Sequence, residues 1–220
     1  MDGFLKIVLL LAVLPVFALL SKYFLPPIIG RVERWMVRFK LKASLPSSYY
    51  TLFNKVLLNH AEGARRIDHI VVSPYGIFVI TARQLSGSIV GSERDARWTR
   101  ILFRFRKRLQ NPMFENGSHI EALQDLLGLD ASRFHSLVIV TGNARFESPM
   151  PVNVTQAGGV LPFIQVRTDH LLGYEEAERA AGVIRSELLK AHKTTRAAKT
   201  SVIKTRLQHV SAVLEPGRRR

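Results

Sequence analysis

The sequence predicts an α/β fold in which a mixed β-sheet is flanked by helices. Three patterns carry this prediction. Residues 67–82 form two apolar strand patterns around a Ser-Pro-Tyr-Gly turn. Residues 111–127 open with Asn-Pro, a capping residue followed by proline at the first helical position, and continue with apolar residues at helical spacing. Residues 136–141 are almost wholly apolar, as in a central strand that is covered on both faces.

Further elements are expected before and after this centre. Residues 31–41 predict a basic helix with Trp35, Met36 and Phe39 on one side. Residues 175–192 predict another helix, because acidic residues stand at its start and basic residues at its end, as the helix dipole prefers. Strands are also expected at residues 49–58, 88–90, 98–105 and 160–166, and a basic helical stripe at residues 203–214.

Length and composition limit the classes of protein to which this chain can belong. Its 220 residues suffice for one domain and an appendage. Cysteine is absent, which excludes a disulfide framework, a thiolate metal site and a cysteine nucleophile. The formal net charge of +15 indicates a polyanionic partner, either nucleic acid or anionic lipid headgroups.

The amino-terminal segment is predicted to anchor the chain in a membrane. Residues 4–25 are mostly apolar and long enough to span a bilayer, which needs about 20 residues. A cleaved signal peptide is the alternative, but no small-x-small cleavage site follows the run. The cationic residues near its end and after it place the remainder of the chain in the cytoplasm. These are Lys22, Arg31, Arg34, Arg38, Lys40 and Lys42.

This interpretation divides the chain into three parts. Residues 1–29 form the anchor and a Pro-Pro hinge, residues 30–172 the main domain, and residues 173–220 a basic helical extension. We therefore expect a single-pass protein of the inner (cytoplasmic) membrane, with its carboxy-terminal domain in the cytoplasm.

The strand patterns at residues 67–82 are expected to bring three reactive side chains together. With a four-residue turn at residues 73–76, Val72 pairs with Ile77, and counting back places Asp68 opposite Thr81. Arg83 lies two residues beyond Thr81 and so shares its face. A carboxylate, a hydroxyl and a guanidinium should therefore meet on one patch, whereas a register slip of one residue would separate them.

The residues of this hairpin resemble the hallmark of the nuclease-related domain (NERD) family. The resemblance rests on residues 63–80, with the Ile67-Asp68-His69 segment joined to the strand that starts at Gly76, on residues 86–91, on Trp98 and on the Asn111-Pro112 pair. It covers the chain from about residue 30 to the helix after Asn111, and more loosely the strand at residues 136–141.

The resemblance implies a bacterial-type protein with a restriction-endonuclease-like core and the PD-(D/E)xK arrangement. There an Asp on one strand and a Glu on the next hold a divalent cation, here Mg²⁺, and a Lys two residues later contacts the phosphate. Asp68 matches the Asp, whereas the Glu and Lys positions fall on Thr81 and Arg83. A hydroxyl is a poorer Mg²⁺ ligand than a carboxylate, and arginine stays protonated and cannot act as a base. The backbone carbonyl of Ala82 is still available as a ligand.

Two other acids are candidates for the missing ligand. By the same resemblance, Glu33 lies near a glutamate position of the family, and Glu115 lies where relatives often carry glutamine. A metal site of Asp68, Glu33 and Glu115 follows if both helices pack beside the hairpin; otherwise Glu115 is a solvated helix-surface acid. His69 and His119 are expected to be hydrogen-bonded structural residues rather than metal ligands.

A dense basic stretch follows the hairpin and is interleaved with Trp98, Phe103 and Phe105. Such a stretch suits contact with a phosphate backbone and stacking on bases, without sequence-specific recognition. Contact with the membrane surface is the alternative interpretation. The basic residues are Arg94, Arg97, Arg100, Arg104, Arg106, Lys107 and Arg108.

The sequence therefore predicts a membrane-anchored cytoplasmic NERD-type protein that binds DNA or RNA nonspecifically and whose metal-dependent phosphodiesterase activity is weak or lost. Two alternatives stay open. One is an active Mg²⁺-dependent nuclease with a rearranged site. The other is a noncatalytic membrane scaffold whose basic face meets anionic lipid or an acidic partner.

Overall fold

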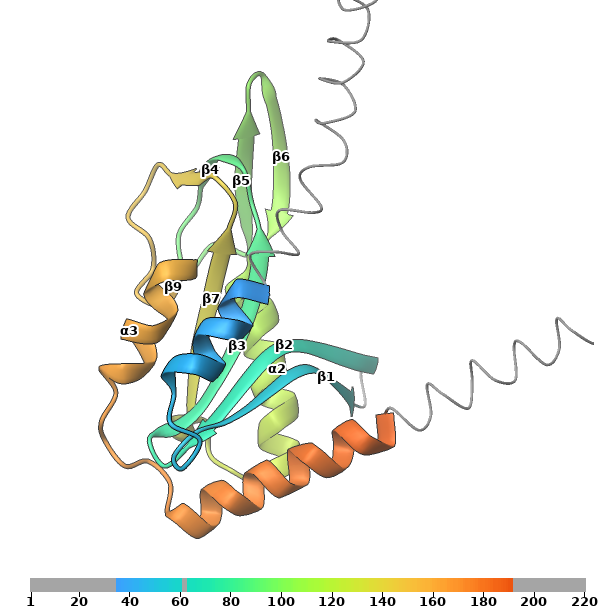
Figure 1. The fold of residues 1–220 in the computed structure, drawn as a ribbon. Coiled ribbons are helices and arrows are strands. Elements are labelled where there is room, and N and C mark those ends of the chain that lie inside the picture. The colour runs from blue at the N-terminus through green and yellow to red at the C-terminus, as the bar shows by residue number, and fades with distance from the viewer. Residues whose placement is uncertain (1–34, 61–62, 192–220) are drawn as a thin grey trace, which may run out of the picture.

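The computed structural model describes residues 35–60 and 63–191 as an α/β fold with two mixed sheets (Figure 1). The predicted anchor at residues 4–25, Glu33 and the helical stripe at residues 203–214 lie outside the described residues. Among the helices in the described part of the chain, none is long and apolar enough to cross a bilayer.

The first sheet has five strands in the order β1-β2-β3-β7-β9. Strands β1, β2 and β3 are antiparallel, whereas β7 runs parallel to β3 and β9 runs parallel to β7. This is the mixed sheet that the sequence predicts. The strands are Thr51–His60 (β1), Gly63–Ser73 (β2), Gly76–Gln84 (β3), Phe134–Thr141 (β7) and Val154–Gln156 (β9).

A second sheet continues from the ends of β3 and β7 and has the strand order β6-β5-β4-β8. Strand β4 pairs in parallel with β8 on one side and antiparallel with β5 on the other, and β5 and β6 form a ribbon that projects from the body of the domain (Figure 1). The strands are Gly87–Val90 (β4), Arg97–Leu102 (β5), Phe105–Gln110 (β6) and Ala144–Phe146 (β8).

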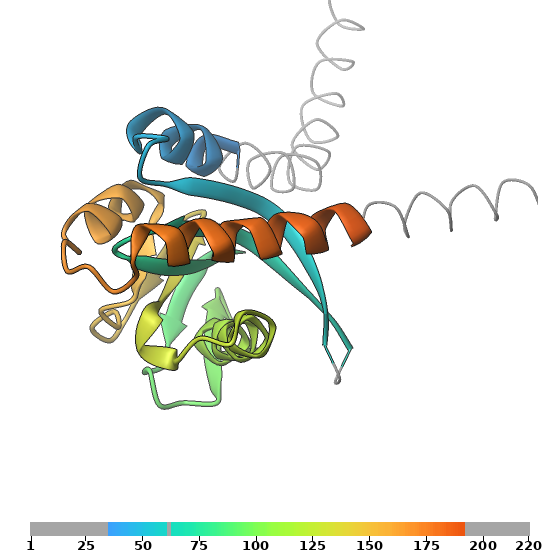
Figure 2. The ribbon, with the colours of Figure 1, turned by 90° about the horizontal axis from the view of Figure 1, so that it is seen from below.

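Helices cover both faces of the first sheet, as Figure 2 shows from below. The helix at residues 35–44 and the short α3 (Val160–Gln165) pack on one face, around Phe78, Ile80 and Leu137. Helix α2 (Pro112–Leu127) and the helix at residues 174–191 pack on the other face, around Ile70 and Val79. Burial on both faces explains why β3 and β7 read as continuous apolar runs.

Much of the predicted element order is confirmed. The turn at residues 73–76 and its two strands are present, with Val72 paired to Ile77. Asn111 caps α2, because its side-chain oxygen accepts a hydrogen bond from the backbone N–H of Met113 at 2.9 Å. Leu123 in the apolar stripe of α2 is fully buried.

Two strand predictions are wrong. The basic stretch at residues 98–105 is not one strand. It contains most of β5, the turn at Phe103, which has a φ of 56°, and the start of β6. No glycine, proline or asparagine marks that turn, so residues 101–106 carry no turn signal. The expected edge strand at residues 160–166 is helix α3, because Val160 and Ile164 share a buried helical face and Pro162 lies in the first turn, where its missing N–H costs no helical hydrogen bond.

Two glycines of this fold should respond oppositely to alanine. Gly142 joins the two sheets with a φ of +91°, and an added Cβ would lie 2.4 Å from the backbone oxygen of Leu85. Gly117 lies inside α2 with open space around it. We expect Gly142→Ala to lower the free energy of unfolding by about 2 kcal/mol or more, and Gly117→Ala to raise it by about 0.5–1 kcal/mol. Urea unfolding measures both, and similar effects at the two positions would contradict the described backbone.

Candidate functional site

The β2–β3 hairpin places Asp68 beside the segment at residues 81–83. The observed pairs run from Ser73–Gly76 to His69–Ile80, which is the predicted register. One carboxylate oxygen of Asp68 accepts a hydrogen bond from the backbone N–H of Ala82 at 3.0 Å. Asp68 is thus fixed to the neighbouring strand by its side chain, just beyond the last β2–β3 pair, His69–Ile80.

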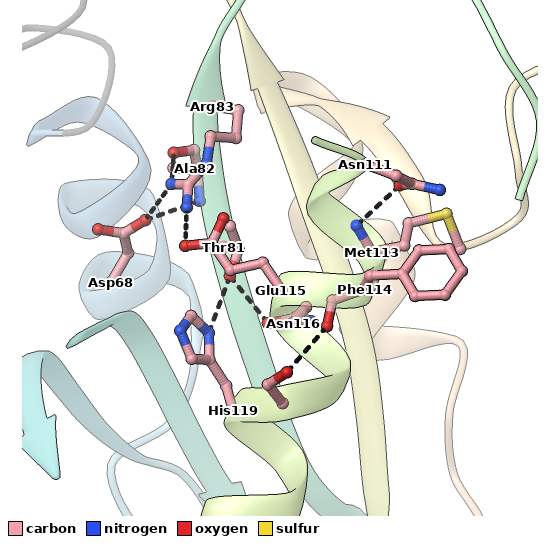
Figure 3. Close-up of polar contacts among 11 residues, drawn as sticks. Asp68, Thr81, Ala82, Arg83, Asn111, Met113, Phe114, Glu115, Asn116 and His119 are labelled. Carbon is pink, nitrogen blue, oxygen red and sulfur yellow. Dashed lines mark hydrogen bonds and ion pairs between the residues drawn. The ribbon is translucent and has the colours of Figure 1, made fainter. Parts of the chain in front are cut away.

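The guanidinium of Arg83 is the centre of the site (Figure 3). One terminal nitrogen lies 3.5 Å from the same Asp68 oxygen and donates to the backbone carbonyl of Ala82 at 2.9 Å. The other terminal nitrogen forms an ion pair with the Glu115 carboxylate. Arg83 therefore bridges β2 and α2, and its side chain is 34% exposed, so solvent still reaches it.

Thr81 lies apart from this cluster, although the sequence places it on the same face as Asp68 and Arg83. Its hydroxyl is fully buried and donates to the Asn116 side-chain oxygen at 2.8 Å. The Asn116 amide in turn donates to the Val79 carbonyl and to the Ser136 hydroxyl, both at 2.8 Å. Figure 3 shows Thr81 turned toward α2 and Asp68 turned toward Arg83, so the expected three-group patch contains two of its three members.

His119 completes the buried network. Its Nδ1 lies 3.3 Å from the Thr81 hydroxyl oxygen, and because Thr81 uses its one proton on Asn116, the network assigns an Nδ1–H donor to His119. Burial lowers the pKa of His119 below its ordinary value, which favours the neutral ring. His119 is thus a hydrogen-bonded structural residue, as predicted, and His69 likewise lies 2.6 Å from the Asn54 side-chain oxygen.

Helix α2 delivers Glu115 to Arg83. The Asn111 amide fixes the start of the helix, because besides capping it donates to the Asp95 carbonyl at 2.8 Å in the loop before β5. Asn116 fixes the next turn against β3. Glu115, in the first turn of α2, therefore reaches Arg83 at the end of β3, and is not simply a solvated surface acid.

A cleft of about 600 Å³ opens beside Asp68 and Arg83. It contains cationic side chains that the sequence interpretation did not assign to the site, together with the exposed ring of Trp35. Lys55 lies on β1, opposite Asp68 of the neighbouring β2, and has a φ of 53°, a left-handed conformation that is uncommon for a residue other than glycine. The additional cations are Arg38, Lys55 and Arg66. They lie on three separate elements, namely the helix at residues 35–44, β1 and β2, and therefore form no local sequence motif that would have predicted them.

The described residues do not fit a bound Mg²⁺. Both carboxylates near the cleft, those of Asp68 and Glu115, are paired with Arg83, and the Ala82 carbonyl accepts from the same group. The Thr81 hydroxyl is buried and turned away. Within residues 35–60 and 63–191 there is no group of three or more histidine, aspartate or glutamate side chains that could hold a metal ion. The third predicted ligand, Glu33, lies outside the described residues.

The buried hydrogen bond between Thr81 and Asn116 can be tested by mutation. Thr81→Val removes the hydroxyl and leaves the Asn116 oxygen buried without its donor, so we expect the free energy of unfolding to fall by about 1–3 kcal/mol. Ser118→Ala is the matched control, since that exposed hydroxyl only returns to the Phe114 carbonyl of its own helix at 3.4 Å, and should change stability by less than about 0.5 kcal/mol. Equal stability of Thr81→Val and the parent would contradict the assigned network.

The chain is similar in sequence to known proteins over about half of its length. The family model of the nuclease-related domain matches residues 29–141, slightly more than half of the chain. An uncharacterized protein of Bacillus anthracis is 33% identical over 122 residues, which cover 56% of this chain and 57% of that protein. The chain thus spans little more than half the length of this relative, and no solved structure matches it significantly. The family match includes the β2–β3 hairpin and extends to the end of β7, so the resemblance seen in the sequence is confirmed: the chain belongs to the nuclease-related domain (NERD) family.

Proposed function

We propose that this protein is a membrane-tethered NERD protein that binds nucleic acid through its phosphate backbone, without sequence preference, and whose metal-dependent phosphodiesterase activity is weak or lost. The observation that carries the proposal is the β5–β6 ribbon, which projects from the domain and bears cations on both faces (Figure 1). Tethering rests on the apolar run at residues 4–25 and the cations that follow it.

The charge pattern of the ribbon favours an anionic partner. Arg100 and Lys107 are direct cross-strand partners, an arrangement in which like charges repel. Arg106 and Arg108 lie on the other face, and no acidic residue occurs between residues 97 and 110. Phosphates would relieve this repulsion and release counterions, which is the main source of nonspecific nucleic-acid affinity.

The tip of the ribbon adds aromatic surface. Phe103 is 89% exposed and Phe105 is 79% exposed, and Arg104 lies between them. Bases of a single strand stack on such rings whatever their identity. The tip therefore suits single-stranded or frayed nucleic acid better than a base-specific contact.

The ribbon and the cleft are connected through Arg83. A pocket of about 230 Å³ at the base of the ribbon is lined by Arg83, Trp98, Leu109 and Glu115 among others. Arg83 also lines the larger cleft, beside Lys55 and Arg66. A nucleic-acid strand bound by the ribbon would thus contact further cations between the ribbon and Asp68.

A restriction-endonuclease-like core is part of the proposal. The order of elements in the first sheet and its helices supports it: a helix, three antiparallel strands, helix α2 after the inserted strands β4 to β6, and then β7 parallel to the third strand. Weak or absent cleavage is inferred from Thr81 and Arg83, which supply neither the second carboxylate nor the lysine of the motif. Arginine holds a phosphate but does not deprotonate water.

A membrane scaffold is the second candidate function. Trp35, Met36 and Phe39 are exposed on the helix at residues 35–44, next to exposed Lys40 and Lys42, a pattern that suits the interface of an anionic bilayer. Binding assays with nucleic acid and with anionic vesicles separate the two candidates.

The first experiment is a salt titration of nucleic-acid binding by the full-length chain. We expect the Arg104→Ala/Arg106→Ala/Arg108→Ala variant to bind duplex DNA roughly tenfold or more weakly at moderate salt, and to flatten the slope of log K against log salt by up to about 2.7. The control Arg179→Ala/Arg185→Ala/Lys190→Ala removes the same charge from the exposed side of the helix at residues 174–191 and should bind like the parent. Unchanged DNA affinity of the ribbon variant, with weaker binding to anionic vesicles, would assign the ribbon to the membrane instead.

The second experiment measures nicking of supercoiled plasmid with Mg²⁺ or Mn²⁺, beside the Asp68→Ala variant. We expect the parent chain to retard the plasmid on a gel without nicking it above the level of Asp68→Ala, because the site lacks a base and a second free carboxylate. Cleavage that Asp68→Ala abolishes would instead identify a working nuclease with a rearranged site.

A further inference from the structure

The groups around Arg83 are those that a divalent cation would use. Two are carboxylates, from Asp68 on β2 and Glu115 on α2, and the third is the backbone carbonyl of Ala82. They come from three separate elements and converge on one guanidinium (Figure 3). Hard cations such as Mg²⁺ prefer carboxylate and carbonyl oxygens of this kind, completed by water.

The guanidinium lies among these oxygens and contacts all three groups, as a bound cation would. One terminal nitrogen donates to both the Asp68 carboxylate and the Ala82 carbonyl, and the other forms an ion pair with Glu115. Arginine keeps its charge at every physiological pH and presents several N–H groups in a fixed plane. The two carboxylates are thereby neutralised in part by a group that is covalently part of the chain.

We propose that Arg83 is a built-in replacement for the divalent metal ion of this site, which makes the site a metal-independent phosphodiester-binding site. The inference goes beyond the proposed function, because it concerns the cation of the site and holds whichever polyanion the ribbon binds. Arg83 is partly exposed toward a cleft whose other cations are Arg38, Lys55 and Arg66. A phosphate entering the cleft would meet this set of cations and needs no metal to offset the charge of Asp68.

The proposal predicts that removal of the guanidinium creates a metal site. We expect full-length Arg83→Ala to bind one Mn²⁺, detected as the loss of the free-ion signal in electron paramagnetic resonance, with an affinity roughly tenfold or more above that of the parent. Asp68→Asn in the Arg83→Ala background should abolish this gain. Mn²⁺ should also raise the melting temperature of Arg83→Ala but not that of the parent, since a ligand stabilises only the state that binds it.

Matched variants test whether a gain in Mn²⁺ binding comes from the position that Arg83 vacates or only from the loss of a positive charge. Arg66→Ala removes a cation of the same cleft but leaves Arg83 between its carboxylates, and should gain no Mn²⁺ site. Arg83→Lys keeps a charge and should also gain none. If Arg83→Ala does not fold, Arg83→Ser carries the same expectation.

Two results of the Mn²⁺ measurements would overturn the proposal. One is a parent chain that already binds Mn²⁺ at a site lost in Asp68→Asn, and the other is a folded Arg83→Ala or Arg83→Ser chain that gains no Mn²⁺ site. Neither measurement contains nucleic acid, so its outcome is separate from that of the DNA-binding experiments. In those experiments, EDTA should leave the affinity of the parent for DNA unchanged within about twofold, and a tenfold loss would also contradict a metal-independent site.

Discussion

The pairing of β2 with β3 is the constraint on which the site depends. The turn at residues 73–76 fixes the register, and this register brings the Asp68 carboxylate to the Ala82 N–H. A shift of one residue would exchange the two faces of β2 and separate the Asp68 carboxylate from the Ala82 N–H and from Arg83. The register is strongly specified, because Ile70 and Val71 are both fully buried on opposite faces of the sheet. The geometry of the site is therefore a consequence of core packing on both sides of one hairpin.

The buried network around Thr81 holds the framework of the site without a charged side chain at position 81. A glutamate at position 81 would place a carboxylate where the structure has a hydroxyl with no access to solvent, and a buried charge without a cation is costly. Thr81 instead satisfies Asn116 and His119, and both neighbours hold α2 against β3. The same helix then presents Glu115 to Arg83. The second carboxylate of the site thus comes from α2 rather than from β3, and it meets an arginine instead of a metal.

The sequence predicted the parts of the fold that rest on local signals. The hairpin register, the Asn111 cap and the buried strand β7 each follow from turn chemistry, capping or hydrophobic pattern within a few residues. The ribbon turn at Phe103 and the helix at Val160 were missed, because their residues carry the propensities of strands and only tertiary packing decides otherwise. For the site, alternation along the strands placed Arg83 correctly beside Asp68. Alternation does not reveal that Thr81 turns to α2 or that Lys55 joins the cleft from β1, since both depend on neighbours distant in sequence.

Binding and cleavage of a phosphodiester place different demands on such a site. Binding requires only cations at the spacing of phosphate oxygens, and the ribbon and the cleft offer these on both sides of Arg83. Cleavage also requires a group that activates water and a cation that holds the water and the phosphate together. Arg83 supplies positive charge but holds no water in its coordination sphere and accepts no proton. An arginine in place of a metal therefore supplies the positive charge that binds a phosphate, but not the activated water that breaks the bond. A site of this kind therefore suits the binding of a phosphodiester better than its cleavage.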